Sequence, residues 1–169
     1  MKKTALTVLL CFAAFAILVG CGNQADEPEQ ISQAVAIGNP WSDWASMEEA
    51  ETAAGFSFGL PEVIADSFTA SAYRTLNNEL IEIIYRDSDS EICVRKKVGE
   101  DQDISGDYNQ YDTCTEETFD GGTATCYWNS GSNAVKQLVS CNGYSWSLVA
   151  PDGYENDSEW DFVKEISKQ

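Results

Sequence analysis

The sequence predicts an α+β domain in which one curved antiparallel sheet carries two short helices on one face. Segments rich in β-branched and aromatic residues recur from residue 56 to residue 150. Short turn sequences separate these segments, and short connections favour antiparallel neighbours, hence a meander of about six or seven strands. Apolar residues recur at helical spacing after the last segment, and a helix-capping pattern stands before the first.

A first helix is predicted over residues 47–54. Ser46 followed by Glu49 is a capping-box pattern, in which two side chains satisfy backbone N–H groups at the start of a helix. Gly55 suits the left-handed conformation that often ends a helix. Trp41 and Trp44 precede this helix, and we expect them to pack near its entry.

Strands are expected where apolar segments alternate with turn sequences such as Asn77-Asn78, Asp120-Gly121-Gly122 and Asn142-Gly143. The candidate segments are residues 56–61, 68–76, 79–86, 91–98, 107–115, 123–129, 134–141 and 144–150.

A second helix is predicted near the C-terminus, capped at Asp157 or Ser158. Its stripe of Trp160, Val163 and Ile166 recurs at helical spacing. Such a stripe must be buried, and the sheet is the surface available to bury it.

The first twenty residues predict a signal peptide. Lys2 and Lys3 precede a mostly apolar run over residues 5–19. This run is shorter than the ~20 apolar residues that a membrane-spanning helix needs, and it ends in small residues. We therefore expect residues 1–20 to be removed.

The end of this segment, Leu18-Val19-Gly20-Cys21, resembles the lipobox of bacterial lipoproteins. In that family the cysteine receives a diacylglyceryl group and becomes the new N-terminus after cleavage. The resemblance implies that Cys21 is lipidated and that the protein is anchored to the cell membrane on its extracytoplasmic face. Two acyl chains hold a protein to a bilayer far more firmly than one. An uncleaved N-terminal helix with an incidental cysteine is the alternative.

Residues 21–38 are polar and acidic without a clear period, which predicts a flexible tether before a domain over residues 39–169. The full sequence carries a net charge of −18 and no histidine. Removal of residues 1–20 would take away two lysines and no acid, so the mature chain is still more negative. Such a charge disfavours nucleic acid and favours solubility, cations or a basic partner.

Four cysteines lie in the predicted domain, and an even number outside the cytoplasm predicts two disulfides. Zinc is the competing interpretation, but a zinc site favours closely spaced C-x-x-C pairs, which are missing here. The pairing stays open, because one residue of slip in a turn moves a side chain to the other face. Two pairings suggest themselves: Cys114–Cys126 closes the shortest loop, and Cys93–Cys114 could bridge neighbouring strands across the acidic connection. The cysteines are Cys93, Cys114, Cys126 and Cys141.

The acidic connection "EDQDISGDYNQYD", residues 100–112, has the ligand spacing of a helix–loop–helix calcium site, including a glycine, Gly106, at the sixth position. The ligands would be Asp101, Asp103, Ser105, the Asp107 carbonyl, Asn109 and Asp112. The flanks, however, have the composition of strands, and the last ligand is Asp in place of a bidentate Glu. A strand connection explains the same residues without a metal, because Gly106 permits a positive φ and the aspartates can bond nearby N–H groups.

Several stretches resemble the 4367 family of domains of unknown function, which occur in secreted or membrane-tethered proteins of Gram-positive bacteria. The likeness runs from Asn39 to the C-terminus, and its specific part is "RKKVGEDQDISGDYNQY", residues 95–111. The resemblance implies an α+β fold and an extracytoplasmic location, and implies no activity. The four cysteines of the domain depart from the family pattern.

The sequence offers no defensible catalytic motif. The commonest catalytic base, histidine, is missing, and a close pair among 28 acidic residues would carry little information. We therefore expect a non-catalytic module that binds a protein, a peptide or a cell-wall component, without a cofactor unless it is calcium. The alternative is a structural domain that orders on binding calcium. Exposed Trp128, Tyr144 and Trp146 side chains lying together would favour the first hypothesis, and converging aspartates the second.

Overall fold

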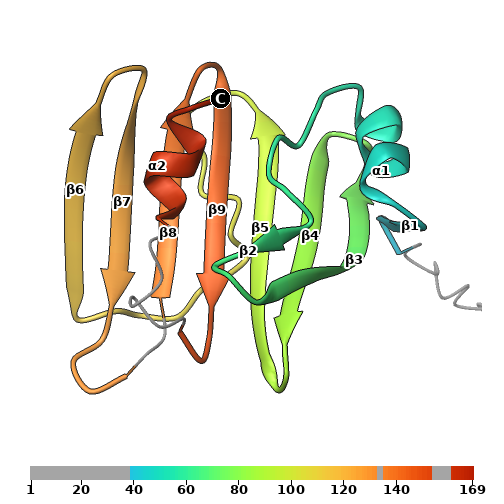
Figure 1. Ribbon diagram of the computed structural model, residues 1–169. Coiled ribbons are helices and arrows are strands. Elements are labelled where there is room, and N and C mark those ends of the chain that lie inside the picture. The colour runs from blue at the N-terminus through green and yellow to red at the C-terminus, as the bar shows by residue number, and fades with distance from the viewer. Residues whose placement is uncertain (1–38, 133–134, 154–160) are drawn as a thin grey trace, which may run out of the picture. The chain divides into compact units, whose positions relative to one another are not determined.

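The computed structural model describes residues 39–132, 135–153 and 161–169, so the predicted signal peptide and tether lie outside it (Figure 1). The described residues form a nine-stranded antiparallel sheet and two helices. The strands are β1 Trp41–Trp44, β2 Val63–Ile64, β3 Phe68–Leu76, β4 Leu80–Asp87, β5 Ser90–Val98, β6 Thr113–Phe119, β7 Gly122–Trp128, β8 Val135–Cys141 and β9 Tyr144–Ala150. The helices are α1 Met47–Ala54 and α2 Phe162–Ile166.

The α+β class is confirmed, but the predicted curved meander of six or seven strands is wrong. The strand order is β1-β3-β4-β5-β9-β8-β7-β6, with β2 also paired to β3, and the sheet is not curled. Two meanders, β3-β4-β5 and β6-β7-β8-β9, are therefore joined by the antiparallel pair of β5 with β9. Turn sequences predict the hairpins within each meander, whereas the join depends on a long connection, residues 99–112, whose path no local signal sets.

The first helix forms over the predicted residues and with the predicted caps. Ser46 Oγ accepts a hydrogen bond from the Glu49 N–H at 3.2 Å, and the Glu49 carboxylate accepts one from the Ala45 N–H at 2.9 Å. Gly55 ends the helix with a φ of +79°. Trp41 and Trp44 were expected only to pack near the helix entry. Residues 41–44 instead form β1, because their backbone pairs with the outer side of β3.

Other element boundaries differ from the prediction. At some of them, backbone N–H groups donate to side-chain carboxylates and not to backbone carbonyls. Residues 56–61 form no strand, since the Phe58 N–H donates to the Glu51 carboxylate at 2.6 Å and not to a neighbouring strand. Residues 107–112 are likewise irregular, and β6 begins at Thr113. Helix α2 is capped by Asp161, whose side chain accepts from the Lys164 N–H at 3.2 Å. The predicted caps at 157 and 158, and Trp160, lie outside the described residues.

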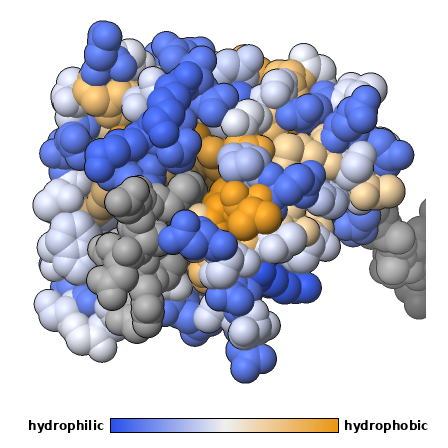
Figure 2. All heavy atoms as spheres, in the orientation of Figure 1, coloured by the Kyte–Doolittle hydropathy of each residue, from blue (hydrophilic) through white to orange (hydrophobic). Residues whose placement is uncertain are grey.

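The core lies between the sheet and the helices. Alternate residues of β4, β5 and β9 point to this face, where Ile83, Val94 and Leu148 are fully buried at directly paired positions. Phe58, from the segment after α1, and Phe162 of α2 cover them, and each is 0 % exposed. Burying one such side chain contributes about 1.5–3 kcal/mol. Figure 2 shows this face as largely hydrophilic, with an apolar area near its middle, over β2.

Candidate functional site

Residues 99–112 cross the face of the sheet opposite to the helices, and in Figure 1 they run behind β8 and β9. The Asp101 N–H donates to Ser140 Oγ at 2.8 Å, and the Gln102 N–H donates to Ser145 Oγ at 3.1 Å. Ile104 and Ser105 are buried against the sheet. The acidic connection thus covers a surface of the sheet, and we call this side the loop face and the other the helix face.

The carboxylates of the loop bind its own backbone. Asp103 Oδ1 accepts from the N–H and the hydroxyl of Ser105, at 3.0 and 2.6 Å. Asp107 accepts from the Asn109 N–H at 2.9 Å and from the Tyr111 hydroxyl at 2.5 Å. Asp112, at the end of the loop, accepts from the Ser130 N–H at 3.1 Å. No three carboxylate or thiol groups of the described residues are placed to hold one metal ion. Calcium binding stays a prediction.

A lysine ammonium lies beside two of the predicted calcium ligands. Lys136 Nζ is 3.4 Å from Asp103 Oδ2 and 3.4 Å from the Asp107 carbonyl oxygen, which are the ligands at positions 3 and 7 of the predicted calcium loop. It also lies 4.6 Å from the Tyr127 ring centroid and 5.7 Å from that of Tyr111. Lys136 is 7 % exposed. The loop therefore has a resident cation supplied by β8.

The electrostatics of Asp103 agree with this arrangement. Burial alone would raise its pKa, but the hydrogen bonds from Ser105 and the charge of Lys136 outweigh burial and hold the pKa below its usual value. Asp103 is thus ionised at neutral pH, and its charge is matched by the ammonium group.

A buried carboxylate on the loop face pairs with an arginine that binds the loop. Glu82, in the middle of β4, is 1 % exposed and pairs with Arg74 and with Arg95, whose Nε lies 2.7 Å from the carboxylate. Arg95 Nη1 also donates to the Ile104 carbonyl in the loop at 2.9 Å. Both guanidinium groups lie over the Trp41 ring of β1, 5.2 and 5.4 Å from its centroid.

Sequence reasoning missed this cluster, although a signal for it exists. Glu82 interrupts the otherwise apolar stretch of β4. In an antiparallel sheet, directly paired residues share a face. Once the register is known, Arg74 and Arg95 stand directly opposite Glu82 on the two neighbouring strands.

Lys96 forms a second internal ammonium site, on the helix face. Its Nζ donates to the Ser57 carbonyl at 2.6 Å and to the Phe58 carbonyl at 3.3 Å. The rings of Tyr144 and Trp146 lie 4.2 and 4.5 Å away. Burial lowers the pKa of Lys96 to about 8, against a smaller opposing effect of the Glu51 carboxylate. The residue ties the segment after α1 to the sheet, and nothing in the sequence singled it out.

Trp128, Tyr144 and Trp146 do not form the exposed aromatic surface that would favour the binding hypothesis. Trp146 is 1 % exposed and lies in the core, where its ring packs against Phe58 and Phe162 at centroid distances of 5.5 and 6.5 Å. Tyr144 and Trp128 are half-buried. The alternation of side chains along β9 places Trp146 on the helix face. The sequence alone did not decide which face of the sheet this residue occupies.

The four cysteines of the domain are free thiols in the structure. Cys93 lies on β5 and Cys114 on β6, and β9, β8 and β7 separate these strands. Four strand spacings amount to about 19 Å, far beyond the ~7 Å between Cα atoms that a disulfide can span. The expectation that these two residues bridge neighbouring strands is therefore wrong, because the acidic connection joins strands that are not neighbours.

Cys114 and Cys126 do lie on adjacent strands, but their side chains point to opposite faces. Cys114 is paired with Tyr127, and Cys126 with Thr115. A shift of β6 by one residue would be needed to bring the two thiols together. Disulfide formation in this chain stays a prediction.

Cys93 is buried beside Glu82, with Sγ 3.3 Å from the carboxylate. Burial, with the Glu82 charge, raises the pKa of its thiol to about 12. Burial also raises the pKa values of Cys126 and Cys141. These thiols are protonated at neutral pH and are therefore poor nucleophiles.

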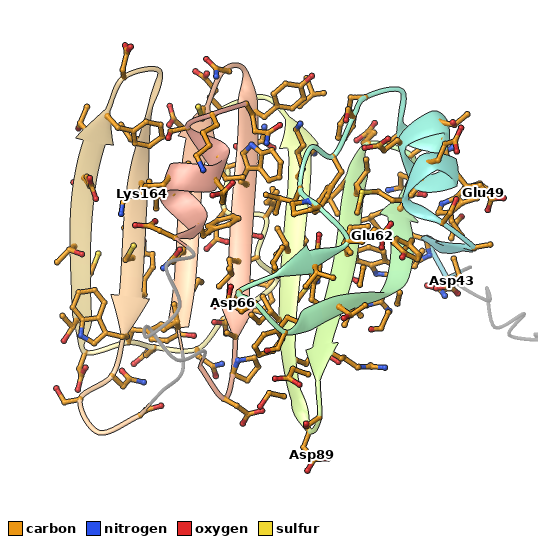
Figure 3. The ribbon with its side chains drawn as sticks, in the orientation of Figure 1. Asp43, Glu49, Glu62, Asp66, Asp89 and Lys164 are labelled. Carbon is orange, nitrogen blue, oxygen red and sulfur yellow. The ribbon has the colours of Figure 1, made fainter. Side chains whose placement is uncertain are left out.

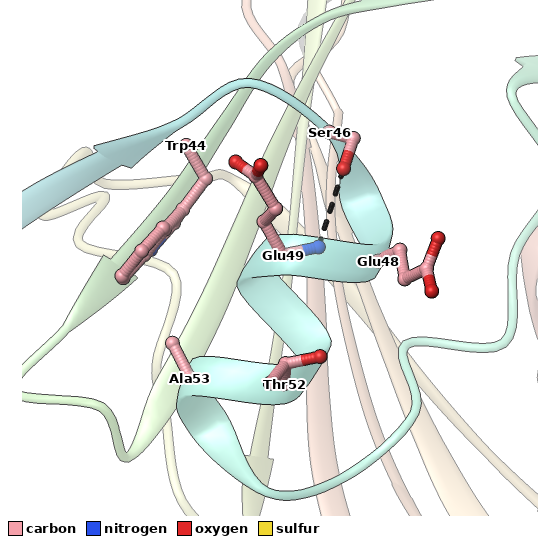
Figure 4. A pocket seen from close by; sticks show the side chains of 6 residues that line it. All are labelled: Trp44, Ser46, Glu48, Glu49, Thr52 and Ala53. Atoms are coloured by element: carbon pink, nitrogen blue, oxygen red, sulfur yellow. Dashed lines mark hydrogen bonds between the residues drawn. The ribbon is translucent and has the colours of Figure 1, made fainter.

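An open pocket lies beside α1, lined by Trp44, Ser46, Glu48, Glu49, Thr52 and Ala53. Figure 4 shows the Trp44 ring beside the Glu49 side chain, with Glu48 pointing away from it. Trp44 Nε1 donates to Thr75 Oγ1 at 3.0 Å, and Glu49 is occupied in capping the helix. Two of the residues that line this pocket, Ser46 and Glu49, thus form the cap of the helix.

The two ends of the sheet differ. At one end, β1 and β2 share the outer side of β3, whose register with β4 shifts between Ala70 and Ala72. At the other end, β6 pairs only with β7 among the described strands, in an unbroken register over its whole length. Its five central residues, 114–118, are all exposed. An open edge of this kind presents unpaired backbone groups that another extended chain can bind.

No family model, curated protein or solved structure matches this chain. The resemblance to the 4367 family therefore stays a prediction. Neither helix in the described part of the chain is long and apolar enough to cross a membrane.

Proposed function

We propose that this protein is a lipid-anchored binding module on the extracytoplasmic face of the cell membrane. Its anchor is Cys21, its tether is residues 21–38, and its domain presents a rigid sheet to a protein, peptide or cell-wall partner. The Leu18-Val19-Gly20-Cys21 sequence supports the anchor. The binding role rests on one observation, the long and regular open edge at β6.

The covering of the two faces supports a role for this edge. The segment after α1 and helix α2 cover the helix face of the central strands, and residues 99–112 cover the loop face. Among the described strands, β6 keeps one side without a paired neighbour. The raised thiol pKa values of Cys93, Cys126 and Cys141 support a binding role over covalent catalysis.

The anchor is tested by the substitution Cys21→Ala. Wild-type protein should fractionate with membranes, and the variant should be released or mislocalised. Recovery of wild-type protein from membranes with its first twenty residues intact would contradict the proposal.

The binding role is tested by photo-crosslinking in intact cells. A photoreactive amino acid at Thr115, in the middle of β6, should give a discrete crosslinked product. The same group at Asp89, which points away from the sheet at the β4–β5 turn (Figure 3), is the matched control. Equal product patterns from the two positions would contradict a binding role for the edge.

A further inference from the structure

We propose that β6 binds an extended basic polypeptide segment, which pairs with the edge as an additional antiparallel strand. This inference rests on the binding role proposed above and specifies its partner. Added strands gain affinity from main-chain hydrogen bonds and specificity from side-chain pairs across the new interface.

The geometry of β6 suits strand addition. All seven of its residues pair with β7 without a bulge, so the strand is straight enough to continue the ladder on its free side. Natural edges are commonly protected by charged side chains, above all lysine, by proline, by a bulge or by very short length. The opposite edge has the last two devices, in β1, β2 and the register shift of β3. Strand β6 has no lysine, proline or bulge and is seven residues long, and of these devices it carries only the acidic side chains of Glu116 and Glu117.

The charge of β6 selects the chemistry of the partner. Glu116 and Glu117 are exposed at its centre and, as successive residues of a strand, point to opposite faces. Asp112 and Asp120 flank the strand, which has no basic residue. A partner strand with two adjacent lysine or arginine residues would therefore meet one carboxylate on each face. Opposite charges stabilise such cross-strand pairs, and like charges destabilise them.

The same charges disfavour a second copy of this chain. If two β6 strands paired antiparallel about their centre, the Glu116 side chains of the two copies would lie directly opposite each other on one face of the joined sheet. The net charge of −18 adds long-range repulsion between copies. The acidic side chains of β6 therefore favour a basic segment and disfavour association with a second copy of the chain.

The test uses the full chain in a zwitterionic detergent and a synthetic nine-residue peptide. The probe alternates threonine and valine and has two adjacent lysines at its centre. One control peptide replaces the lysines with glutamates. A second control keeps the lysines but carries N-methyl groups on alternate residues, which removes backbone donors and preserves the charge. Binding is measured by calorimetry, and hydrogen exchange reports the protection of the β6 amides.

The probe should bind and slow exchange of the β6 amides, and neither control should do so. The variant Glu116→Lys/Glu117→Lys should weaken binding at least about tenfold, because two attractive pairs become repulsive. The matched variant Asp89→Lys/Asp152→Lys makes the same change in net charge at exposed turns away from β6, and should bind within about twofold of wild type.

Three outcomes would overturn the proposal. Equal binding of the N-methylated peptide would show attraction between charges without strand pairing. A dimer that dissociates in the Glu116→Lys/Glu117→Lys variant would identify a second copy as the occupant. Failure of the probe to bind at millimolar concentration would exclude a basic strand, while a discrete crosslink from Thr115 in cells would still support the binding role of the edge.

Discussion

The two faces of the sheet each fasten an irregular segment with a buried lysine, but they differ in what surrounds that lysine. On the helix face, Lys96 donates to two carbonyls among aromatic rings, and Phe58 of the same segment is fully buried beside it. On the loop face, Lys136 pairs with a carboxylate, and the loop above it is held by hydroxyls and by Arg95. The helix face thus depends mainly on apolar burial, and the loop face on matched charges.

The largest expected effect comes from breaking the charge cluster of the loop face. Glu82→Gln leaves Arg74 and Arg95 without their counter-ion, which should lower the free energy of unfolding by about 3–5 kcal/mol. Replacing all three residues by Leu or Met should restore much of this loss, since the uncompensated charges are gone. Urea denaturation measures both changes.

The matched substitution on the helix face is Phe58→Ala, for which cavity formation predicts a loss of about 3–5 kcal/mol as well. The two variants should differ in hydrogen exchange. Glu82→Gln should speed exchange in residues 99–112, and Phe58→Ala should speed it in the segment after α1. The same pattern in both variants would show that the faces are not independent.

A glycine substitution tests how closely the loop depends on Arg95. Gly106 has a φ of +64°, and an added Cβ would overlap Arg95 Nη1. Gly106→Ala should therefore cost about 2–3 kcal/mol. Gly55→Ala is the control, because Gly55 has a φ of +79° with no atom near an added Cβ, and should cost only about 1–2 kcal/mol. Equal losses would mean that the contact with Arg95 adds nothing.

The positive φ of Gly106 and the whole of α1 were predictable from sequence, because both depend on residues within a few positions of each other. The hydrogen bonds from loop N–H groups to the Asp103 and Asp107 carboxylates were predictable for the same reason. The path of the loop was not, since it is set by Ser140, Ser145 and Arg95 on other strands.

The contact of the Lys136 ammonium with the loop could not be predicted from the sequence either. Lys136 lies 33 residues after Asp103, and only the pairing of β8 with β9 brings it under the loop. The alternation of β9 likewise decided that Trp146 is core. Caps, turns and hydrogen bonds within a few residues could be predicted from this sequence. Contacts between strands distant in the sequence could not, because they depend on how the two meanders join.

The next effect concerns the resident cation. Lys136→Met keeps the length of the side chain and removes its charge, leaving Asp103 without the ammonium. We expect a loss of about 1–2 kcal/mol in the absence of calcium. If the ammonium takes the place of a metal, millimolar calcium should stabilise the variant and leave wild type unchanged, because a ligand stabilises the state it binds. A calcium-dependent rise in the melting temperature of wild type would contradict this expectation.

The two faces should respond oppositely to alkaline pH. The pKa of Lys96 is lowered from 10.5 to about 8, so the folded state binds its proton less tightly than the unfolded state does. Stability contributed by this group should rise with pH between about 8 and 10.5. The pKa of Cys93 on the loop face is raised from 9.0 to about 12, so its contribution should fall with pH above 9.

Each slope is at most about 1.4 kcal/mol per pH unit. The free energy of unfolding of wild type minus that of Lys96→Met should increase from pH 8 to pH 9, and the Cys93 thiol, present in both proteins, cancels in this difference. The corresponding difference for Cys93→Ala should decrease above pH 9. A difference that is flat in pH for Lys96→Met would show that its ammonium is not destabilised by burial.

The smallest expected effect is at the two ends of the acidic loop, Asp101 and Asp112. Asp101 has a φ of +57° and holds the loop through its backbone N–H, while Asp112 accepts from the Ser130 N–H. Asparagine tolerates positive φ and keeps an acceptor oxygen, so Asp101→Asn/Asp112→Asn preserves both features. Removing two negative charges from so acidic a chain also relieves repulsion. The change in the free energy of unfolding should stay within about 0.5 kcal/mol, without calcium dependence. A dedicated calcium site predicts otherwise: wild type would melt several degrees higher in millimolar calcium, and the double substitution would abolish that rise, since these residues are the first and last ligands of the predicted loop. Thermal melts of both proteins with and without calcium therefore distinguish a loop held by its own lysine from one held by a metal.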